Sequence, residues 1–289
     1  MTGAQQTRDP APVSNGSVPH VSPDGKHIAF VSNRTGNDDL FVISADGTGE
    51  MQLTHTPEDE RLLGWTADGK QVLFSVSADG ASRVYSVDLD EKNRRQIGNV
   101  AGIALAVSSD GKKRLLSRTT PLTVSALDGS DARQITDGSS VAWNPDWSPD
   151  GKRIAFTSRN DPKSLVAVFI INDDGLGRHQ ASHVPPEESG ARGGAQCAVW
   201  SPDGWLLALQ VNNLNSKTAH LWLVDVVTGE GRKLGAHDQP YVDETPSWFP
   251  DGKRIAFQSN RTGKMEVWVM NADGSGQRQV TRLKNDVEP

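Results

Sequence analysis

The sequence predicts an all-β chain folded as a six-bladed β-propeller with four antiparallel strands in each blade. Two observations predict this fold: a turn motif ending in Asp-Gly recurs six times along the 289 residues, and a β-type stretch follows every copy. The Asp residues of successive copies are separated by 44, 42, 40, 53 and 48 residues. Each interval is the length of four short strands with their turns, so each copy marks one blade.

The motif copies are tight-turn sequences. The Asp-Gly pair supplies the positive φ that hairpin turns need, and a preceding Pro restricts its own φ to about −65°. The motif therefore indicates turn chemistry rather than a catalytic signature. The copies are SPDG at 22–25, TADG at 66–69, SSDG at 108–111, SPDG at 148–151, SPDG at 201–204 and FPDG at 249–252.

The strands of each blade follow from what surrounds its turn. An apolar residue, in four blades a Trp, precedes the turn, and an alternating stretch such as residues 27–32 (HIAFVS) follows it. These two stretches predict the first two strands, and the Trp side chains are expected to pack between blades. A third apolar stretch and a more polar fourth one, such as residues 51–54 (MQLT), complete the blade. Polar residues suit the outer edge strand of a sheet.

The main structural alternative is an open solenoid. Against it, the approach Asp286–Pro289 repeats the approach Asp243–Pro246 into the last blade, so the chain ends in phase with its own beginning near Pro19. No helix-period segment interrupts the repeats. We therefore predict one closed domain over residues 17–289. The polar composition of residues 1–16 favours a disordered tail, and an added clasping strand is the alternative.

Composition excludes several classes of partner. The formal net charge is −6 and no basic face is evident, which argues against nucleic acid and anionic membranes. No apolar run is long enough to span a bilayer, and residues 1–16 lack the apolar stretch of a secretory signal. The single cysteine, Cys197, excludes an internal disulfide and is interpreted as a small buried hydrophobe.

No motif indicates a metal or a cofactor. The acidic residues Asp243, Glu244, Asp286 and Glu288 could attract Ca²⁺, but their spacing matches no calcium loop. We therefore expect neither a metal site nor a cofactor.

The predicted binding face is the one where the innermost strands begin, here named the rim face; the opposite face, which carries the Asp-Gly turns, is the turn face. The rim-face loops vary most in length and composition, and variable loops on a rigid scaffold usually carry binding residues. Arg34 and Arg261 are instead expected to pair with acidic residues of an adjoining blade, such as Asp243, Glu244 or Asp286. The candidate ligand- or partner-binding residues are His20, Arg61, Trp143, Arg192, Gln196, His237, Tyr241, Asp243 and Glu244.

Two long segments carry a family resemblance: SNRTGNDDLFVISADGTGEMQLT at 32–54 and SNRTGKMEVWVMNADGSGQRQVT at 259–281. With WSPDGKRIAFTS at 147–158, they resemble the repeat of TolB-like propellers. The resemblance implies a six-bladed ring with a central channel, in a family that includes protein-binding propellers, the propeller domains of serine peptidases and carbohydrate-active lyases. It implies a periplasmic or secreted location, whereas a native start at Met1 without a signal would imply the cytoplasm.

Three hypotheses about function remain open on the sequence. The first is a monomeric, non-catalytic scaffold for a protein or peptide partner, because no nucleophile-base pair, no metal set and no Gly-x-Ser-x-Gly elbow is present. The second is a hydrolase, lyase or lactonase-like enzyme acting on a small or carbohydrate substrate, with His20, His237 and Asp243 or Glu244 as general acid and base. The third is that the chain is part of a larger peptidase or sensor.

Overall fold

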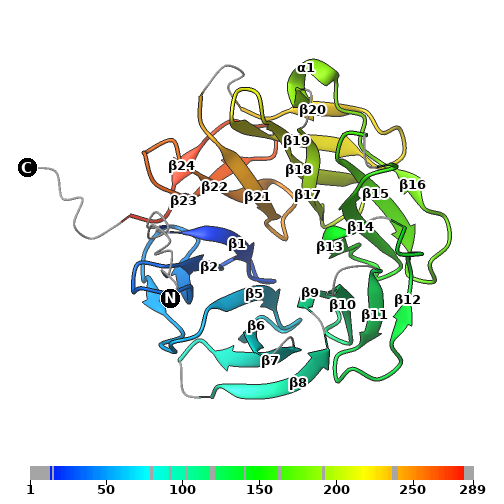
Figure 1. The fold of residues 1–289 in the computed structure, drawn as a ribbon. Coiled ribbons are helices and arrows are strands. Elements are labelled where there is room, and N and C mark those ends of the chain that lie inside the picture. The colour runs from blue at the N-terminus through cyan, green and yellow to red at the C-terminus, as the bar shows by residue number, and fades with distance from the viewer. Residues whose placement is uncertain are drawn as a thin grey trace, which may run out of the picture.

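The chain forms a ring of six separate sheets, as Figure 1 shows. The computed structural model describes residues 14, 16–78, 81–90, 93–101, 103–117, 121–139, 141–161, 164–190, 193–235 and 240–282. Each sheet contains four antiparallel strands that follow chain order from the centre of the ring outwards. The prediction of a six-bladed propeller is therefore confirmed, and the solenoid alternative is excluded.

Each blade is one continuous stretch of the chain. The strands are β1 (Ser17–Val21), β2 (His27–Ser32), β3 (Asp39–Ser44) and β4 (Met51–Gln52) in blade one; β5 (Glu60–Trp65), β6 (Gln71–Ala78), β7 (Ala81–Asp88) and β8 (Arg95–Ala101) in blade two; β9 (Ile103–Val107), β10 (Lys113–Ser117), β11 (Thr123–Ala126) and β12 (Arg133–Gln134) in blade three. Blade four holds β13 (Trp143–Trp147), β14 (Arg153–Ser158), β15 (Ala167–Asn172) and β16 (His179–Gln180); blade five holds β17 (Gly194–Trp200), β18 (Leu206–Asn213), β19 (Thr218–Asp225) and β20 (Gly231–Lys233); blade six holds β21 (Asp243–Trp248), β22 (Arg254–Ser259), β23 (Glu266–Asn271) and β24 (Arg278–Gln279).

Helix is almost absent from the part of the chain that the structure describes. Its one helix, α1 (Pro186–Ser189), is a single turn in the connection from blade four to blade five. Among the described residues no helix has the length and apolar character needed to cross a membrane.

The repeated motif forms the turn between the first and second strands, as predicted. In blade one the Ser22 hydroxyl donates to Asp24 at 2.7 Å, the same carboxylate accepts the Lys26 N–H at 3.0 Å, and Gly25 has a φ of 70°. The same Ser-to-Asp and backbone-to-Asp bonds recur in blades three, four and five. Local hydrogen bonding of this kind makes the turn independent of the rest of the fold.

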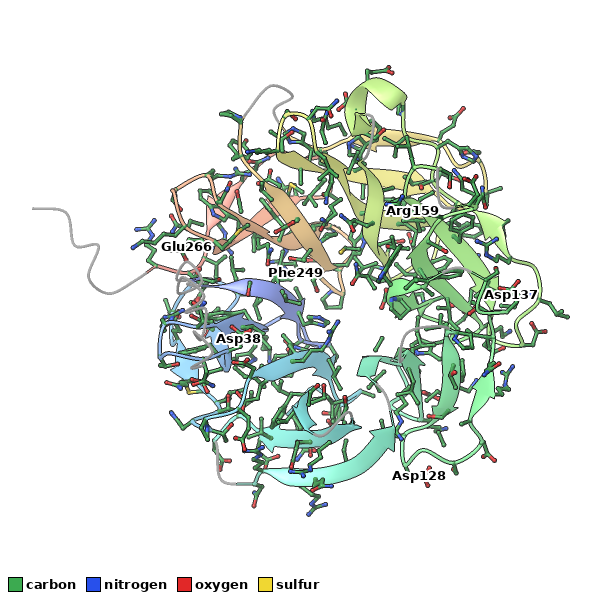
Figure 2. All side chains as sticks on the ribbon, in the orientation of Figure 1. Asp38, Asp128, Asp137, Arg159, Phe249 and Glu266 are labelled. Carbon is green, nitrogen blue, oxygen red and sulfur yellow. The ribbon has the colours of Figure 1, made fainter. Side chains whose placement is uncertain are left out.

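The hydrophobic core lies between the blades rather than within them. Trp147 packs with Leu115 of blade three, Trp200 with Val168 of blade four, and Trp248 with Ala208 of blade five. All three Trp residues are buried, which confirms the predicted inter-blade packing. Figure 2 shows side chains filling the spaces between neighbouring sheets, with Phe249 beside blade one.

The ring closes between blade six and blade one without exchanging a described strand. The Val18 N–H donates to Gln258 Oε1 at 2.7 Å, and the Val21 N–H donates to Ser247 Oγ at 3.0 Å. On the turn face the Arg278 guanidinium donates to the Ala45 carbonyl. Side-chain acceptors on one blade and backbone donors on the next therefore join the first and last sheets. The predicted tail falls mostly on residues 1–13 and 15, which are outside the described residues.

Candidate functional site

A channel with a volume of about 1170 Å³ runs along the axis of the ring. The innermost strands of all six blades contribute to its wall, and the acidic residues Asp38, Glu58 and Asp59 lie on the rim-face loops of blades one and two that border it. This is the central channel that the resemblance implied.

An irregularity in the innermost strands shapes the channel wall. In four blades the pairing with the second strand skips two residues, between Ser17 and His20 in blade one and at the corresponding points in blades four, five and six. In each of these blades, the first of the two unpaired residues has a left-handed backbone. These residues are Val18, Asn144, Cys197 and Thr245, with φ of 49°, 45°, 52° and 49°. A bulge of this kind bends the strand and redirects its side chains, and all four residues line the channel.

The left-handed backbone is held by side chains of the preceding blade. The N–H groups of Cys197, Thr245 and Val18 donate to Thr157 Oγ1 at 3.2 Å, Gln210 Oε1 at 3.0 Å and Gln258 Oε1 at 2.7 Å, respectively. Left-handed φ costs a β-branched residue about 1–2 kcal/mol, so it persists only where surrounding contacts hold it. The bulge is therefore built by contacts between blades.

Four of the predicted site residues occupy one equivalent position in different blades. Arg61, Trp143, Gln196 and Glu244 each lie four residues before the Trp that ends the innermost strand. This position is next to the bulge, at the rim-face end of the strand. Arg61 lines the channel, whereas Trp143 is 40% exposed on the rim face. Four scattered candidates therefore share one layer of the ring.

Glu244 is not free for acid-base chemistry. Its carboxylate accepts from Gln258 Nε2 at 2.6 Å and from Gln210 Nε2 at 3.3 Å. The same two amides hold the bulges of blades one and six through their oxygens. Glu244 thus orients both glutamines and links three neighbouring blades.

Tyr241 and Asp243 contact Arg261 of the same blade. Arg261 Nη2 lies 2.8 Å from both oxygens of Asp243, its Nε donates to Ser259 Oγ at 2.9 Å, and its guanidinium lies 4.5 Å from the centre of the Tyr241 ring. Asp243 is therefore held in an ion pair.

Asp243 is the partner of Arg261, as expected, but the two residues belong to the same blade. Arg261 pairs with Asp243 inside blade six, and Arg34 pairs with Glu50 inside blade one at 2.7 Å. Each arginine lies in the loop after its blade's second strand.

His20 and Asp146 occupy equivalent positions in blades one and four, which face each other across a six-bladed ring. Both are half-buried in the channel wall. Burial lowers the pKa of His20 to about 4, so the imidazole is neutral at physiological pH. Burial raises the pKa of Asp146 to about 7, even though its carboxylate accepts the Trp200 N–H at 3.0 Å.

The raised pKa of Asp146 predicts a loss of stability as the pH rises. Between pH 3.8, its ordinary pKa, and about 7 the folded chain holds a proton there that the unfolded chain has lost. Stability from this group is therefore present below pH 3.8 and is lost as the pH rises through about 7. We expect Asp146→Asn, which still offers an acceptor to Trp200, to be more stable than the parent at pH 8 by about 1–2 kcal/mol, since channel water screens a half-buried group.

Urea unfolding at pH 5 and pH 8 measures this gain, with Asp131→Asn as the control because Asp131 is exposed. A difference between Asp146→Asn and the parent that stays the same at both pH values would contradict the prediction.

Cys197 differs from the predicted buried hydrophobe. It is half-buried, lines the channel and accepts a hydrogen bond from Asn144 Nδ2 at 2.9 Å. Burial raises the pKa of its thiol to about 12, and Glu244 adds to the rise while Arg61 opposes it. At neutral pH the group is therefore a protonated thiol and not a nucleophilic thiolate.

Two predicted site residues, Arg192 and His237, lie outside the described residues. Described residues of the connection between blades four and five, His183, Val184, Pro185 and Ser189, line a second cavity of about 470 Å³ together with Val166 and Ser182. Among the described residues no three His, Cys, Asp or Glu side chains are grouped so that they could hold a metal ion.

The sequence did not identify Thr157, Gln210 and Gln258, although they shape the channel. A usable signal was present, because each of these polar residues interrupts an apolar second strand, as in LLALQV and RIAFQS. A polar side chain at a buried strand position needs a hydrogen-bonding partner, and here that partner is the next blade's bulge.

Two family models match the chain. The model described as "TolB beta propeller domain" matches residues 107–288, and the one described as "Tricorn protease N-terminal beta propeller domain" matches residues 4–124.

Among curated proteins, Dipeptidyl-peptidase 5 of Porphyromonas gingivalis is 23% identical over 92% of this chain and 48% of its own length. The chain thus spans about half the length of this relative.

Solved structures share the fold. TolB from Acinetobacter baumannii matches with a TM-score of 0.73 at 19% identity, over 90% of this chain and 65% of that one. An oligogalacturonate lyase in complex with manganese matches with a TM-score of 0.61 at 16% identity, over 96% of this chain and 80% of that one. At these identities the matches show the fold alone.

Proposed function

Because the chain belongs to the TolB beta-propeller domain family, we propose that it is a non-catalytic scaffold that binds a peptide or protein segment at the rim face and in the central channel. The observation that carries the proposal is the size of the channel, about 1170 Å³, with all six blades in its wall. Small-molecule pockets have volumes of about 300–1,000 Å³, so this channel exceeds a typical small-ligand site and has room for a peptide segment.

Three acid-base candidates predicted from the sequence, Asp243, Glu244 and His20, are poorly suited to proton transfer. Asp243 is held by Arg261, and Glu244 is held by two glutamine amides. The pKa of His20 is lowered to about 4, which makes it a poor base at neutral pH. The name of Dipeptidyl-peptidase 5 also indicates a relative that acts on peptides.

A selected peptide tests the proposal. A random peptide library is displayed on phage and selected on the immobilised protein, and the strongest binder is titrated against two variants. Ser17→Trp places a large ring at the channel wall, whereas Met51→Trp places the same ring on an outer strand where the side chain is 40% exposed. We expect Ser17→Trp to weaken binding by about tenfold or more, which corresponds to about 1.4 kcal/mol, and Met51→Trp to leave it unchanged.

Equal binding by the two variants would place the binding surface elsewhere. If no peptide is selected while the purified protein turns over a small ester or an oligouronate, the enzyme hypothesis replaces the scaffold. In that case, activity retained after His20→Gln would remove His20 from the acid-base assignment.

A further inference from the structure

Arg61 is a cation in the channel without an anionic partner. Its side chain is exposed to the channel, and no carboxylate of the described chain lies within ion-pair distance of its guanidinium. The surrounding protein lowers the pKa of Arg61, yet a guanidinium stays charged in proteins. Arg34 and Arg261, by contrast, are paired with Glu50 and Asp243.

The opposite wall offers hydrogen-bonding groups at one level of the channel. Blade two, which carries Arg61, faces blade five across the ring, and Arg61 is close enough to Cys197 for its charge to affect the pKa of the thiol. The neighbouring left-handed residues are Asn144 in blade four and Thr245 in blade six. Both line the same channel.

The donors of this wall are weakly used. Thr245 Oγ1 is buried and has no hydrogen-bond partner in the described chain. Asn144 Nδ2 donates to the Cys197 sulfur, which is a weak acceptor. The left-handed backbone of Thr245 is strained but held by Gln210 of the preceding blade, and such strain concentrates at ligand-binding sites. A ligand oxygen would be a better acceptor for both donors than the groups they meet now.

We propose that Arg61, Asn144 and Thr245 bind the C-terminal carboxylate of a peptide that enters the channel from the rim face. This inference rests on the proposed function and names the chemical group that is recognised. A carboxylate has two oxygens that match the planar fork of a guanidinium and can also accept from an amide and a hydroxyl.

The charge of the channel mouth favours a peptide over a polyanion. Asp38, Glu58 and Asp59 border the channel, and the pKa of Asp38 is raised by burial and by the nearby Asp59 carboxylate. Like charges repel an incoming chain that is negative along its length. A neutral or cationic peptide brings only its terminal carboxylate, which can pass this acidic border to reach Arg61. Glu244 does not compete for Arg61, because two glutamine amides hold it.

Ligand-observed NMR titration tests the proposal with trialanine, trialanine amide and trigalacturonate. We expect the parent protein to bind trialanine with a free carboxylate about tenfold more tightly than the amide, as the loss of a charge-assisted pair implies. Arg61→Gln should abolish that preference, and Arg61→Lys should keep part of it. The control Arg95→Gln changes an exposed arginine in β8 of the same blade and should keep all of it.

Each outcome decides the proposal. Equal affinity for trialanine and its amide, no binding of either, or a preference that survives Arg61→Gln would overturn it. Tighter binding of trigalacturonate that depends on Arg61 would also overturn it and would assign the site to an acidic sugar. The scaffold function is tested separately with the phage-selected peptide. If Ser17→Trp blocks binding of that peptide but amidation of its C-terminus does not weaken binding, the scaffold function is kept and only the carboxylate site is overturned.

Discussion

Replacing Gly194 with alanine is expected to lower the free energy of unfolding by more than about 3 kcal/mol. Gly194 begins β17 and has a φ of 138°, a backbone conformation that other residues rarely adopt. A Cβ there would lie 2.0 Å from the carbonyl oxygen of Val166 in blade four. That oxygen belongs to the backbone, accepts the Ala195 N–H at 3.1 Å and cannot rotate away. The substitution therefore separates blades four and five at their rim-face contact.

Gly36→Ala is the matched control for this effect. Gly36 also has a positive φ, 117°, but a Cβ added there meets nothing within 4 Å. It should cost about 1–2 kcal/mol from backbone strain alone. Urea unfolding measures the loss of unfolding free energy in both variants, and the difference between the two losses is the cost of the collision between the blades. Equal losses for the two variants would show that Val166 moves away freely, and the close contact between the blades would then contribute little.

The second large effect is expected at the ion pair of blade six. Arg261→Ala should destabilise the protein by about 3–5 kcal/mol, because it leaves the carboxylate of the buried residue Asp243 without its partner. The guanidinium also lies 4.5 Å from the centres of the Tyr241 and Trp268 rings, and those contacts would be lost. Arg261→Lys keeps the charge but not the planar fork, so we expect an intermediate loss.

Arg34→Ala is the comparison, because Arg34 occupies the equivalent loop of blade one. Its partner Glu50 lies just before the outer strand β4, and the side chains of Arg34 and Glu50 are 16% and 19% exposed, against 13% and 10% for Arg261 and Asp243. We expect a smaller loss, about 1–2 kcal/mol. Adding Asp243→Asn to Arg261→Ala should recover part of the stability, since it removes the buried charge. If thermal and urea unfolding give the same loss for Arg261→Ala and Arg34→Ala, burial of the pair is not the cause.

The site was only partly predictable from the sequence. Arg61, Trp143, Gln196 and Glu244 were proposed because they lie in loops or strand ends of the rim face, and the structure places them in one layer of the ring. Their environments could not be foreseen. The sequence shows Glu244 as a free acid, whereas Gln210 from blade five and Gln258 from blade six enclose it.

The sequence by itself determined the number of blades, the strands within them and the inter-blade role of the Trp residues. Those features depend on turn chemistry and apolar alternation within a few residues, which act locally. Only the tertiary structure decided which polar groups meet in the channel. The N–H of Cys197 is held by Thr157, 40 residues earlier, and that of Val18 by Gln258, 240 residues later. Such partners are set by how one sheet packs against the next, and local sequence does not encode that contact.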